Sequence, residues 1–263
     1  MHIYLIYVAI GVFAGFLSGL LGISGGVLTV PLLVTTFGMI GFPDENSMHV
    51  AIGTSLAAMV FNSISSSRAH IKRKGVVWPL VLKMIPGIVV GVVFGAFTAY
   101  LLSDEILESV FALFLLLLSL YYFFKKEPHA GEHKLPKSPV LVGLGAIVGY
   151  ISNILGVGGG IFCVPLFTYF RLPFVKAIGT SIIAGFVISF LGAVSYLFFG
   201  MNVKIPYPHV YGYIYLPAFL IIGVISFFIA PYGARISHAI PHNYLRKAFA
   251  VLLLLMSSFV YFF

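Results

Sequence analysis

Two glycine clusters carry the residues of this chain that could bind a ligand. Gly22 to Gly26 interrupts one apolar segment, and Gly156 to Gly160 interrupts another 134 positions later; Pro31 and Pro165 follow at the same spacing. Glycine weakens a helix, so the chain is expected to unwind at both places. The segments that follow would then begin with free N–H groups at the positive end of a helix dipole. Such helix starts hold anions, and the clusters therefore predict an anion site.

Polar side chains near the clusters could complete this site. Ser24, Thr29 and Ser152 offer hydroxyl groups, and Asn153 offers an amide. An Ala-Ile-Gly-Thr-Ser block also occurs twice, over 51–55 and 177–181. Its hydroxyls either line the same site or bond back to a carbonyl of their own helix. The predicted substrate-binding residues are Gly22, Ser24, Gly25, Gly26, Thr54, Ser55, Asn153, Gly156, Gly158, Gly159, Gly160, Thr180 and Ser181. The competing interpretation of the clusters is close helix packing through small residues.

The remaining polar residues argue against several other kinds of site. No Asp or Glu lies inside an apolar segment, and the eight His lie in loops or near segment ends. This pattern disfavours a proton relay through a membrane carboxylate and offers no cluster of metal ligands. No nucleophile lies beside a matching base, so we expect neither an enzyme nor a bound cofactor. The single Cys163 allows no internal disulfide.

The composition indicates that lipid surrounds the chain. Of its 263 residues 60% are hydrophobic and 8% are charged, and the mean hydropathy is +1.10. We therefore expect an all-α, polytopic bundle of transmembrane helices. The first apolar segment lacks a basic flank and ends in the glycine motif, so it is interpreted as mature structure. The apolar segments lie at about 3–21, 27–40, 49–67, 76–102, 106–124, 139–155, 161–170, 177–199, 211–233 and 244–263. The short segments 27–40 and 161–170 are either tilted spans or half-helices that enter the membrane and return.

The charges predict how the chain crosses the membrane. Basic residues follow the third, fifth, seventh and ninth segments, whereas the alternate loops are mainly acidic. Placing the basic loops in the cytoplasm leaves both termini outside. The formal net charge of +8 is then an orientation signal in a cytoplasmic-membrane protein whose partner is the lipid bilayer. Nucleic acid is excluded as a partner because no soluble module presents a basic face.

The repetition divides one membrane domain, 1–263, into two halves. The halves cover about 1–124 and 139–263, and a polar cytoplasmic linker, 125–138, joins them. Gly95-Ala96, Ala112 and Ser119 return 138 positions later. Each half has five hydrophobic segments, so the second half starts on the opposite side of the membrane. This is the parity of two inverted-topology repeats with glycine-broken helices, in which a substrate binds between the halves.

These motifs resemble the sulfite exporter TauE/SafE family of membrane proteins. The resemblance rests on the two glycine clusters with their prolines and on the paired Ala-Ile-Gly-Thr-Ser blocks, and it covers nearly the whole chain. The first cluster departs from a glycine triplet because it has Ser24 where the second has Gly158. The resemblance implies export of sulfite, sulfoacetate or a related small sulfur-containing anion. Two alternatives remain open: cation-coupled uptake of thiosulfate or another sulfur anion, and a membrane scaffold that transports nothing. The sequence does not predict an oligomeric state.

Overall fold

The computed structural model describes residues 2–21, 25–124, 135–236 and 250–258. Gly22 and Ser24 of the predicted site and most of the linker lie outside these residues. The described chain is almost entirely helical, with a helical segment over 250–258 and one short hairpin of two strands. Its elements are α1 (His2–Leu21), α2 (Gly26–Met39), η1 (Asp44–Asn46), α3 (Ser47–Lys72), α4 (Trp78–Leu101), α5 (Asp104–Phe124), α6 (Ser138–Ile154), α7 (Gly160–Tyr169), α8 (Phe174–Gly200), β1 (Val210–Tyr211), β2 (Ile214–Tyr215) and α9 (Leu216–Ile236).

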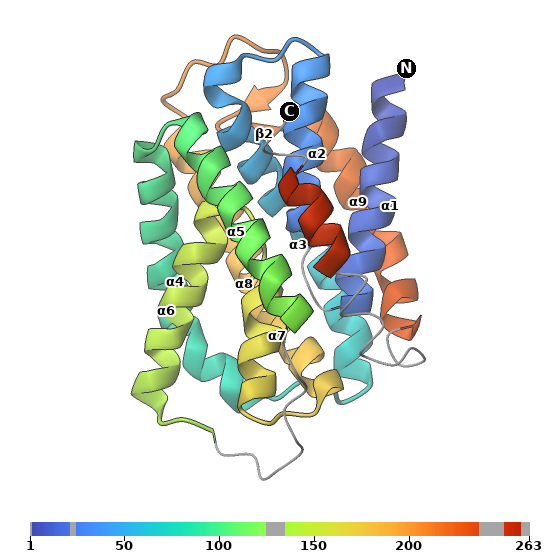
Figure 1. The fold of residues 1–263 in the computed structure, drawn as a ribbon, viewed down its shortest axis with the longest axis vertical. Helices are drawn as coiled ribbons and strands as arrows, with labels where there is room; N and C mark the ends of the chain where they lie inside the picture. Colours follow the sequence, from blue (N-terminus) through green and yellow to red (C-terminus); the bar gives the residue numbers. More distant parts are fainter. Residues whose placement is uncertain (1, 22–24, 125–134, 237–249, 259–263) are drawn as a thin grey trace.

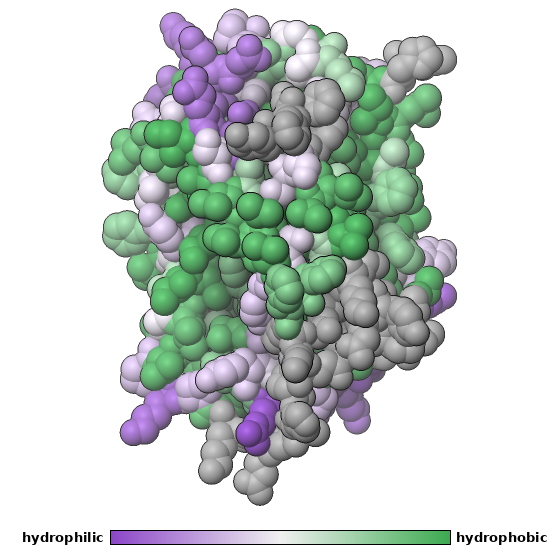
Figure 2. Space-filling model, viewed as in Figure 1, coloured by the Kyte–Doolittle hydropathy of each residue, from purple (hydrophilic) through white to green (hydrophobic). Residues whose placement is uncertain are grey.

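The helices are built for a bilayer. Among the described residues, six helical segments are long and apolar enough to cross a membrane. Figure 2 shows the corresponding surface, with hydrophobic side chains across the middle of the molecule and hydrophilic ones at its two ends. Exposed Phe, Leu and Val side chains on a soluble protein of this size would be unfavourable, whereas lipid solvates them. The chain is therefore a multi-pass membrane protein.

Two helices of the bundle reach only one of its ends. In Figure 1, α1 descends from the upper end and α2 climbs back to it, while α6 climbs from the lower end and α7 returns there. With 14 and 10 residues, α2 and α7 are about 21 and 15 Å long, short of the roughly 30 Å hydrocarbon core. Of the two possibilities for segments 27–40 and 161–170, the structure has the half-helices.

Acidic and basic residues of the connections lie at opposite ends of the bundle. Asp44 and Asp104 lie where η1 and the start of α5 form the upper end in Figure 1. Lys72 and Arg235 close α3 and α9 at the lower end, and Arg171 lies there between α7 and α8. This is the separation on which the predicted topology depends.

The helix packing is matched between the halves. Helix α1 packs along α9 and α4 packs along α6, each through glycines so close to the neighbouring backbone that a side chain would collide with it. Helix α3 contacts α8 and α9, and α8 contacts α4 in turn. The Ser119 hydroxyl of α5 donates to Ala250 O (2.9 Å), and the Ser257 hydroxyl donates to Ala112 O (3.0 Å). The two bonds are equivalent in the repeat, because Ser257 and Ala250 stand 138 positions after Ser119 and Ala112.

One predicted boundary is wrong. The apolar segment expected over 211–233 begins with a hairpin, and α9 starts only at Leu216. Val210 pairs with Tyr215 and Tyr211 with Ile214, so a two-residue turn at Gly212 reverses the chain. The hairpin is as apolar and aromatic as a helix that spans lipid, and hydropathy alone does not separate the two.

Candidate functional site

The second glycine cluster ends one helix and starts another. Gly156 has a φ of +61°, a left-handed conformation that glycine adopts without strain. The Gly156 N–H donates to Asn153 O (3.2 Å), and the Val157 N–H donates to Ser152 O (3.0 Å). This pair of bonds is a Schellman motif, which satisfies the last carbonyls of α6. We call residues 155–160 the second elbow, and Gly25 with Gly26 the described part of the first elbow.

Both half-helices begin without a side-chain cap. Gly25 precedes α2 and Gly159 precedes α7, and neither start has a capping hydrogen bond from a side chain among the described residues. The first intrahelical bonds run from Leu28 N to Gly25 O (3.1 Å) and from Phe162 N to Gly159 O (3.2 Å). The N–H groups that precede them have no acceptor within their helix. Two helix N-termini, each with buried amides that lack an acceptor within their helix and with a positive dipole end, thus lie inside the bundle.

The two elbows touch each other. A Cβ added at Gly26 would lie 2.4 Å from Gly156 O and 3.0 Å from the Val157 Cα, closer than real Cβ atoms approach a backbone oxygen. The Ser55 hydroxyl of α3 donates to Gly156 O (3.2 Å) and so joins the first half to the second elbow. Gly26, Gly156 and Ser55, three of the predicted site residues, therefore meet where the halves join.

Helix α8 leaves room beside the first amides of α7. A Cβ added at Gly185 would find only Gly160 N (3.8 Å) and Gly159 N (3.9 Å) within 4 Å outside its own helix, apart from its chain neighbours. At the related position of α3, 126 residues earlier, stands Met59, whose methyl group would lie 3.1 Å from a Cβ at Gly26. A methionine side chain thus reaches the first elbow from the position at which α8 has only a glycine, while Ile188 of α8 packs against Gly159.

Buried hydroxyl and amide groups lie on α6 and α8, the two helices beside α7. The Ser152 Oγ, the Ser189 Oγ and the Asn153 Oδ1 have no hydrogen-bond partner among the described residues, and all three side chains are fully buried. The Asn153 Nδ2 donates to Val92 O (2.7 Å), which fixes the amide. A buried polar atom without a partner is costly, and such atoms commonly mark a place that water or a ligand occupies.

The related hydroxyls of the first half are paired. The Ser18 hydroxyl donates to Asn62 Oδ1 (3.3 Å), which links α1 to α3, and the Ser63 hydroxyl lies 3.4 Å from the same oxygen. Ser18 corresponds to Ser152 and Ser63 to Ser189 in the repeat. Sequence reasoning did not select Ser18, Ser63 or Ser189, although repetition of a serine at matched positions was the available signal.

The threonines of the repeated blocks have other partners. The Thr54 hydroxyl accepts from Tyr215 N (2.9 Å), and the Thr180 hydroxyl accepts from Val77 N (3.0 Å). Tyr215 and Val77 each stand directly before a helix, α9 and α4, so both threonines satisfy the backbone at a helix start. Gly53 and Gly179 pack closely against the same two connections. These groups do not meet at the elbows.

Two of the predicted residues remain to be placed. The Ser181 hydroxyl donates to Ile178 O (2.7 Å) of its own helix. Gly158 is buried within the second elbow. The described residues contain no group of three His, Cys, Asp or Glu that could hold a metal ion.

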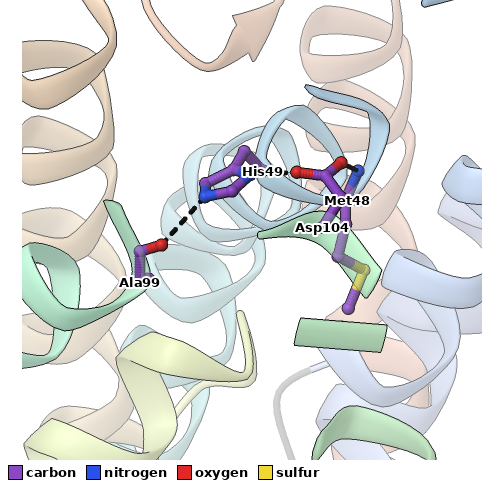
Figure 3. Close-up of polar contacts among 4 residues, drawn as sticks. All are labelled: Met48, His49, Ala99 and Asp104. Carbon is purple, nitrogen blue, oxygen red and sulfur yellow. Dashed lines mark hydrogen bonds and ion pairs between the residues drawn. The ribbon is translucent and has the colours of Figure 1, made fainter. Parts of the chain in front are cut away.

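A buried contact between a histidine and an aspartate at the upper end was not predicted from the sequence. Figure 3 shows His49 of α3 between Asp104, the first residue of α5, and Ala99 in the last turn of α4. The His49 Nδ1 contacts Asp104 Oδ1, and both side chains are less than a tenth exposed. The Tyr213 ring stacks on the imidazole, and burial raises the pKa of that phenol to about 12, so it stays neutral. Both residues lie at ends of apolar segments, and no pattern in the sequence indicates that they are buried together.

Comparison with known proteins places these features in a family. The sulfite exporter TauE/SafE family model matches residues 7–260. A protein of Haemophilus influenzae named "Probable membrane transporter protein" is 33% identical over 255 residues, covering 96% of each chain. A protein of Methanocaldococcus jannaschii, "Probable membrane transporter protein MJ0441", is 29% identical over 257 residues, covering 96% of this chain and 93% of its own. No solved structure matches. The family and the names of these relatives indicate a membrane transporter and not an enzyme, and the chain belongs to the sulfite exporter TauE/SafE family.

Proposed function

We propose that this transporter moves a small sulfur-containing anion, such as sulfite or sulfoacetate, out of the cell across the cytoplasmic membrane. The observation that carries the proposal is the start of α7. The amide nitrogens of Gly159 and Gly160, which no side chain caps among the described residues, lie beside Gly185 of α8. The unpaired hydroxyls of Ser152 and Ser189 belong to the two helices beside it. These groups are all hydrogen-bond donors, as the oxygens of a sulfite or sulfonate require.

The electrostatics of the elbows favour an anion without fixing it permanently. Helices α2 and α7 run in opposite directions away from the centre in Figure 1, so their positive ends point toward each other. The donors at this place are backbone amides and hydroxyls, which carry no full charge. A site of neutral donors attracts an anion inside a low-dielectric bundle and still releases it, as a transporter must.

Matched packing of the two halves supports inverted repeats. The paired interfaces, α1 with α9 and α4 with α6, and the exchanged bonds of Ser119 and Ser257 are the contacts expected of two halves related by a two-fold axis. In such transporters one half rocks against the other around a fixed central site. Ser55 and Gly26 hold the halves together at that site, so we place the pivot of this motion there.

A polar stripe on α3 offers the route toward the basic end. Ser63, Ser66 and Ser67 are spaced three and four residues apart, so they share one helix face, and all are buried. The Ser66 and Ser67 hydroxyls have no partner among the described residues. We place the basic end in the cytoplasm and both termini outside. The inside-negative potential then favours loss of an anion by about 2.3 kcal/mol per charge per 100 mV, which allows export without a coupling cation.

The proposal is tested by flux. Purified protein in liposomes loaded with radiolabelled sulfite or sulfoacetate is expected to release label when a negative interior potential is imposed. Ser152→Ala and Ser189→Ala are expected to slow release. Ser226→Ala is the matched control, because that buried hydroxyl donates to Gly223 O of its own helix.

Three results would count against the proposal. Release of neither anion would favour a scaffold over a transporter of these solutes. Flux of thiosulfate that requires a sodium or pH gradient would replace export with coupled uptake. Equal release by all three serine variants and the unaltered protein would remove the anion site from the second elbow.

A further inference from the structure

The His49–Asp104 pair has a hydrogen-bond arrangement that requires an additional proton. The His49 Nε2 lies 2.9 Å from Ala99 O, and a carbonyl oxygen can only accept, so Nε2 carries a hydrogen. The His49 Nδ1 faces Asp104 Oδ1 (Figure 3). With the hydrogen already on Nε2, a neutral imidazole would present its Nδ1 lone pair to a carboxylate oxygen. The contact is favourable only when a proton lies between the two atoms.

Two helix ends favour the charged form of this pair. The Met48 N–H in the first turn of α3 donates to Asp104 Oδ2 (2.6 Å), so the carboxylate lies at the positive end of α3. Ala99 O belongs to the last turn of α4, so the imidazole lies at the negative end of that helix. The arrangement therefore stabilises an imidazolium on His49 and a carboxylate on Asp104.

The surrounding ionisable groups come from every neighbouring element. Tyr213 of the hairpin stacks on the imidazole at 4.9 Å between ring centroids. The others near the pair are phenols of α4 and α8 and carboxyls of α5 and η1: Tyr100, Tyr196, Glu105, Glu108 and Asp44. Glu105 is exposed, so water screens its charge from the pair.

The pair is connected to the hairpin that covers this end. Tyr213 contacts His49 by stacking, and the Tyr213 N–H donates to Tyr196 O (3.4 Å). The Tyr196 hydroxyl donates to Asn153 O (3.2 Å) at the end of α6, next to the second elbow. Helix α3 makes a second connection, because Thr54 accepts from Tyr215 N. A change at His49 thus reaches both the hairpin and the elbow through direct contacts.

We propose that His49 and Asp104 form a proton-binding site at the acidic end, and that its proton holds the 210–215 hairpin closed over that end. When the Nδ1–H bond breaks, the proton leaves to water on that side and the imidazole becomes neutral. The lone pair of Nδ1 then faces the Asp104 carboxylate, so the contact that joins α3 to α5 weakens. The hairpin, whose Tyr213 ring stacks on His49, then opens. The closed state binds one proton more than the open state, so it is favoured at low pH and lost as pH rises. The site does not depend on which solute is carried.

The proton is measured directly by ¹⁵N NMR of the histidine rings in detergent micelles, with the His49 signals identified by their loss in His49→Gln. Near neutral pH both ring nitrogens of His49 are expected to carry a hydrogen in the unaltered protein. In Asp104→Asn, one nitrogen is expected to lose it. A neutral His49 ring with one bare nitrogen in the unaltered protein would overturn the proton site.

The hairpin is followed by hydrogen–deuterium exchange of its amides between about pH 6 and about pH 9, corrected for the intrinsic pH dependence of exchange. The unaltered protein is expected to exchange these amides faster at high pH. At the low-pH end, Asp104→Asn is expected to exchange them at least about tenfold faster than the unaltered protein, because a hydrogen bond between charged groups shifts an opening equilibrium by that factor. At the high-pH end, where the unaltered protein has lost the proton, this difference is expected to shrink. His49→Gln is expected to show no remaining pH dependence.

Glu105→Gln is the matched control, an exposed carboxyl beside Asp104 on the same turn, and is expected to behave as the unaltered protein. Hairpin exchange that is independent of pH, or equal in Asp104→Asn and Glu105→Gln, would show that the proton on the pair does not hold the hairpin closed. Neither measurement uses anion transport, so this proposal and the proposed substrate can fail separately.

Discussion

Replacing Gly185 by alanine separates anion binding from stability. The added methyl carbon would lie 3.8 Å from Gly160 N and 3.9 Å from Gly159 N, in ordinary contact with both. No backbone has to move, and alanine in place of glycine inside a helix is favourable by up to about 1 kcal/mol. An anion oxygen bound to these amides sits about 2.9 Å from the nitrogen. The methyl group therefore takes the space that a bound anion needs without disturbing the fold.

The size of the effect follows from the lost contact. A hydrogen bond to a charged group contributes about 1.5 to 3 kcal/mol. Losing one such bond weakens affinity by about ten- to a hundredfold, since about 1.4 kcal/mol is a factor of ten. The expected result for Gly185→Ala is thus a protein at least as heat-stable as the original that binds sulfite far more weakly.

The assay compares melting and sulfite binding in one preparation. Gly143→Ala is the matched control, because a Cβ added at this helical glycine of α6 would have no contact within 4 Å beyond its chain neighbours and the nearby backbone of its own helix. It is expected to gain similar stability and to bind sulfite normally. Undiminished sulfite affinity in Gly185→Ala would refute the placement of the anion at the start of α7.

The hydrogen bonds of Thr180, Ser119 and Ser257 and the membrane topology lead to separate predictions. Thr180→Val leaves the amide it accepts from unpaired and is expected to cost about 1 to 3 kcal/mol of stability with unchanged sulfite affinity; a loss of affinity at equal stability would return Thr180 to the site. Ser119→Ala and Ser257→Ala are expected to lower the free energy of unfolding by similar amounts, about 1 kcal/mol each, because they make equivalent bonds between the halves; clearly unequal losses in chemical denaturation would contradict the two-fold relation. For topology, a membrane-impermeant thiol reagent on intact cells is expected to label cysteine placed at Glu45 but not at Lys137, in a variant without the native cysteine; the opposite pattern would invert the orientation.

The repetition of the sequence predicted more than the composition did. Apolar segments predicted the helices, and the glycine clusters predicted where two of them break. Repetition also singled out Thr54 and Thr180 without showing their roles. Their partners, Tyr215 N and Val77 N, lie 161 and 103 positions away in the chain, and a single sequence gives no such pairing.

The features without a repeat were not predictable. His49 and Asp104 stand 55 positions apart at the ends of apolar segments, where charged residues normally face water. The contacts of α3 with α5, with the last turn of α4 and with the hairpin bury them, and the second half has no matching pair in the sequence. The importance of Gly185, which stands where the first half has Met59, was equally unpredictable from the sequence. It depends on which atoms lie beside each residue in the fold.

The central claim is that an anion is held by the first amides of α7 at the junction of the two halves. Crystals grown with selenite, a heavier analogue of sulfite, test this directly through the anomalous scattering of selenium. A selenium peak is expected within hydrogen-bonding reach of the Gly159 and Gly160 amides, between Ser152 and Ser189. A peak at the basic end of the bundle, with the elbows empty at saturating selenite, would contradict it.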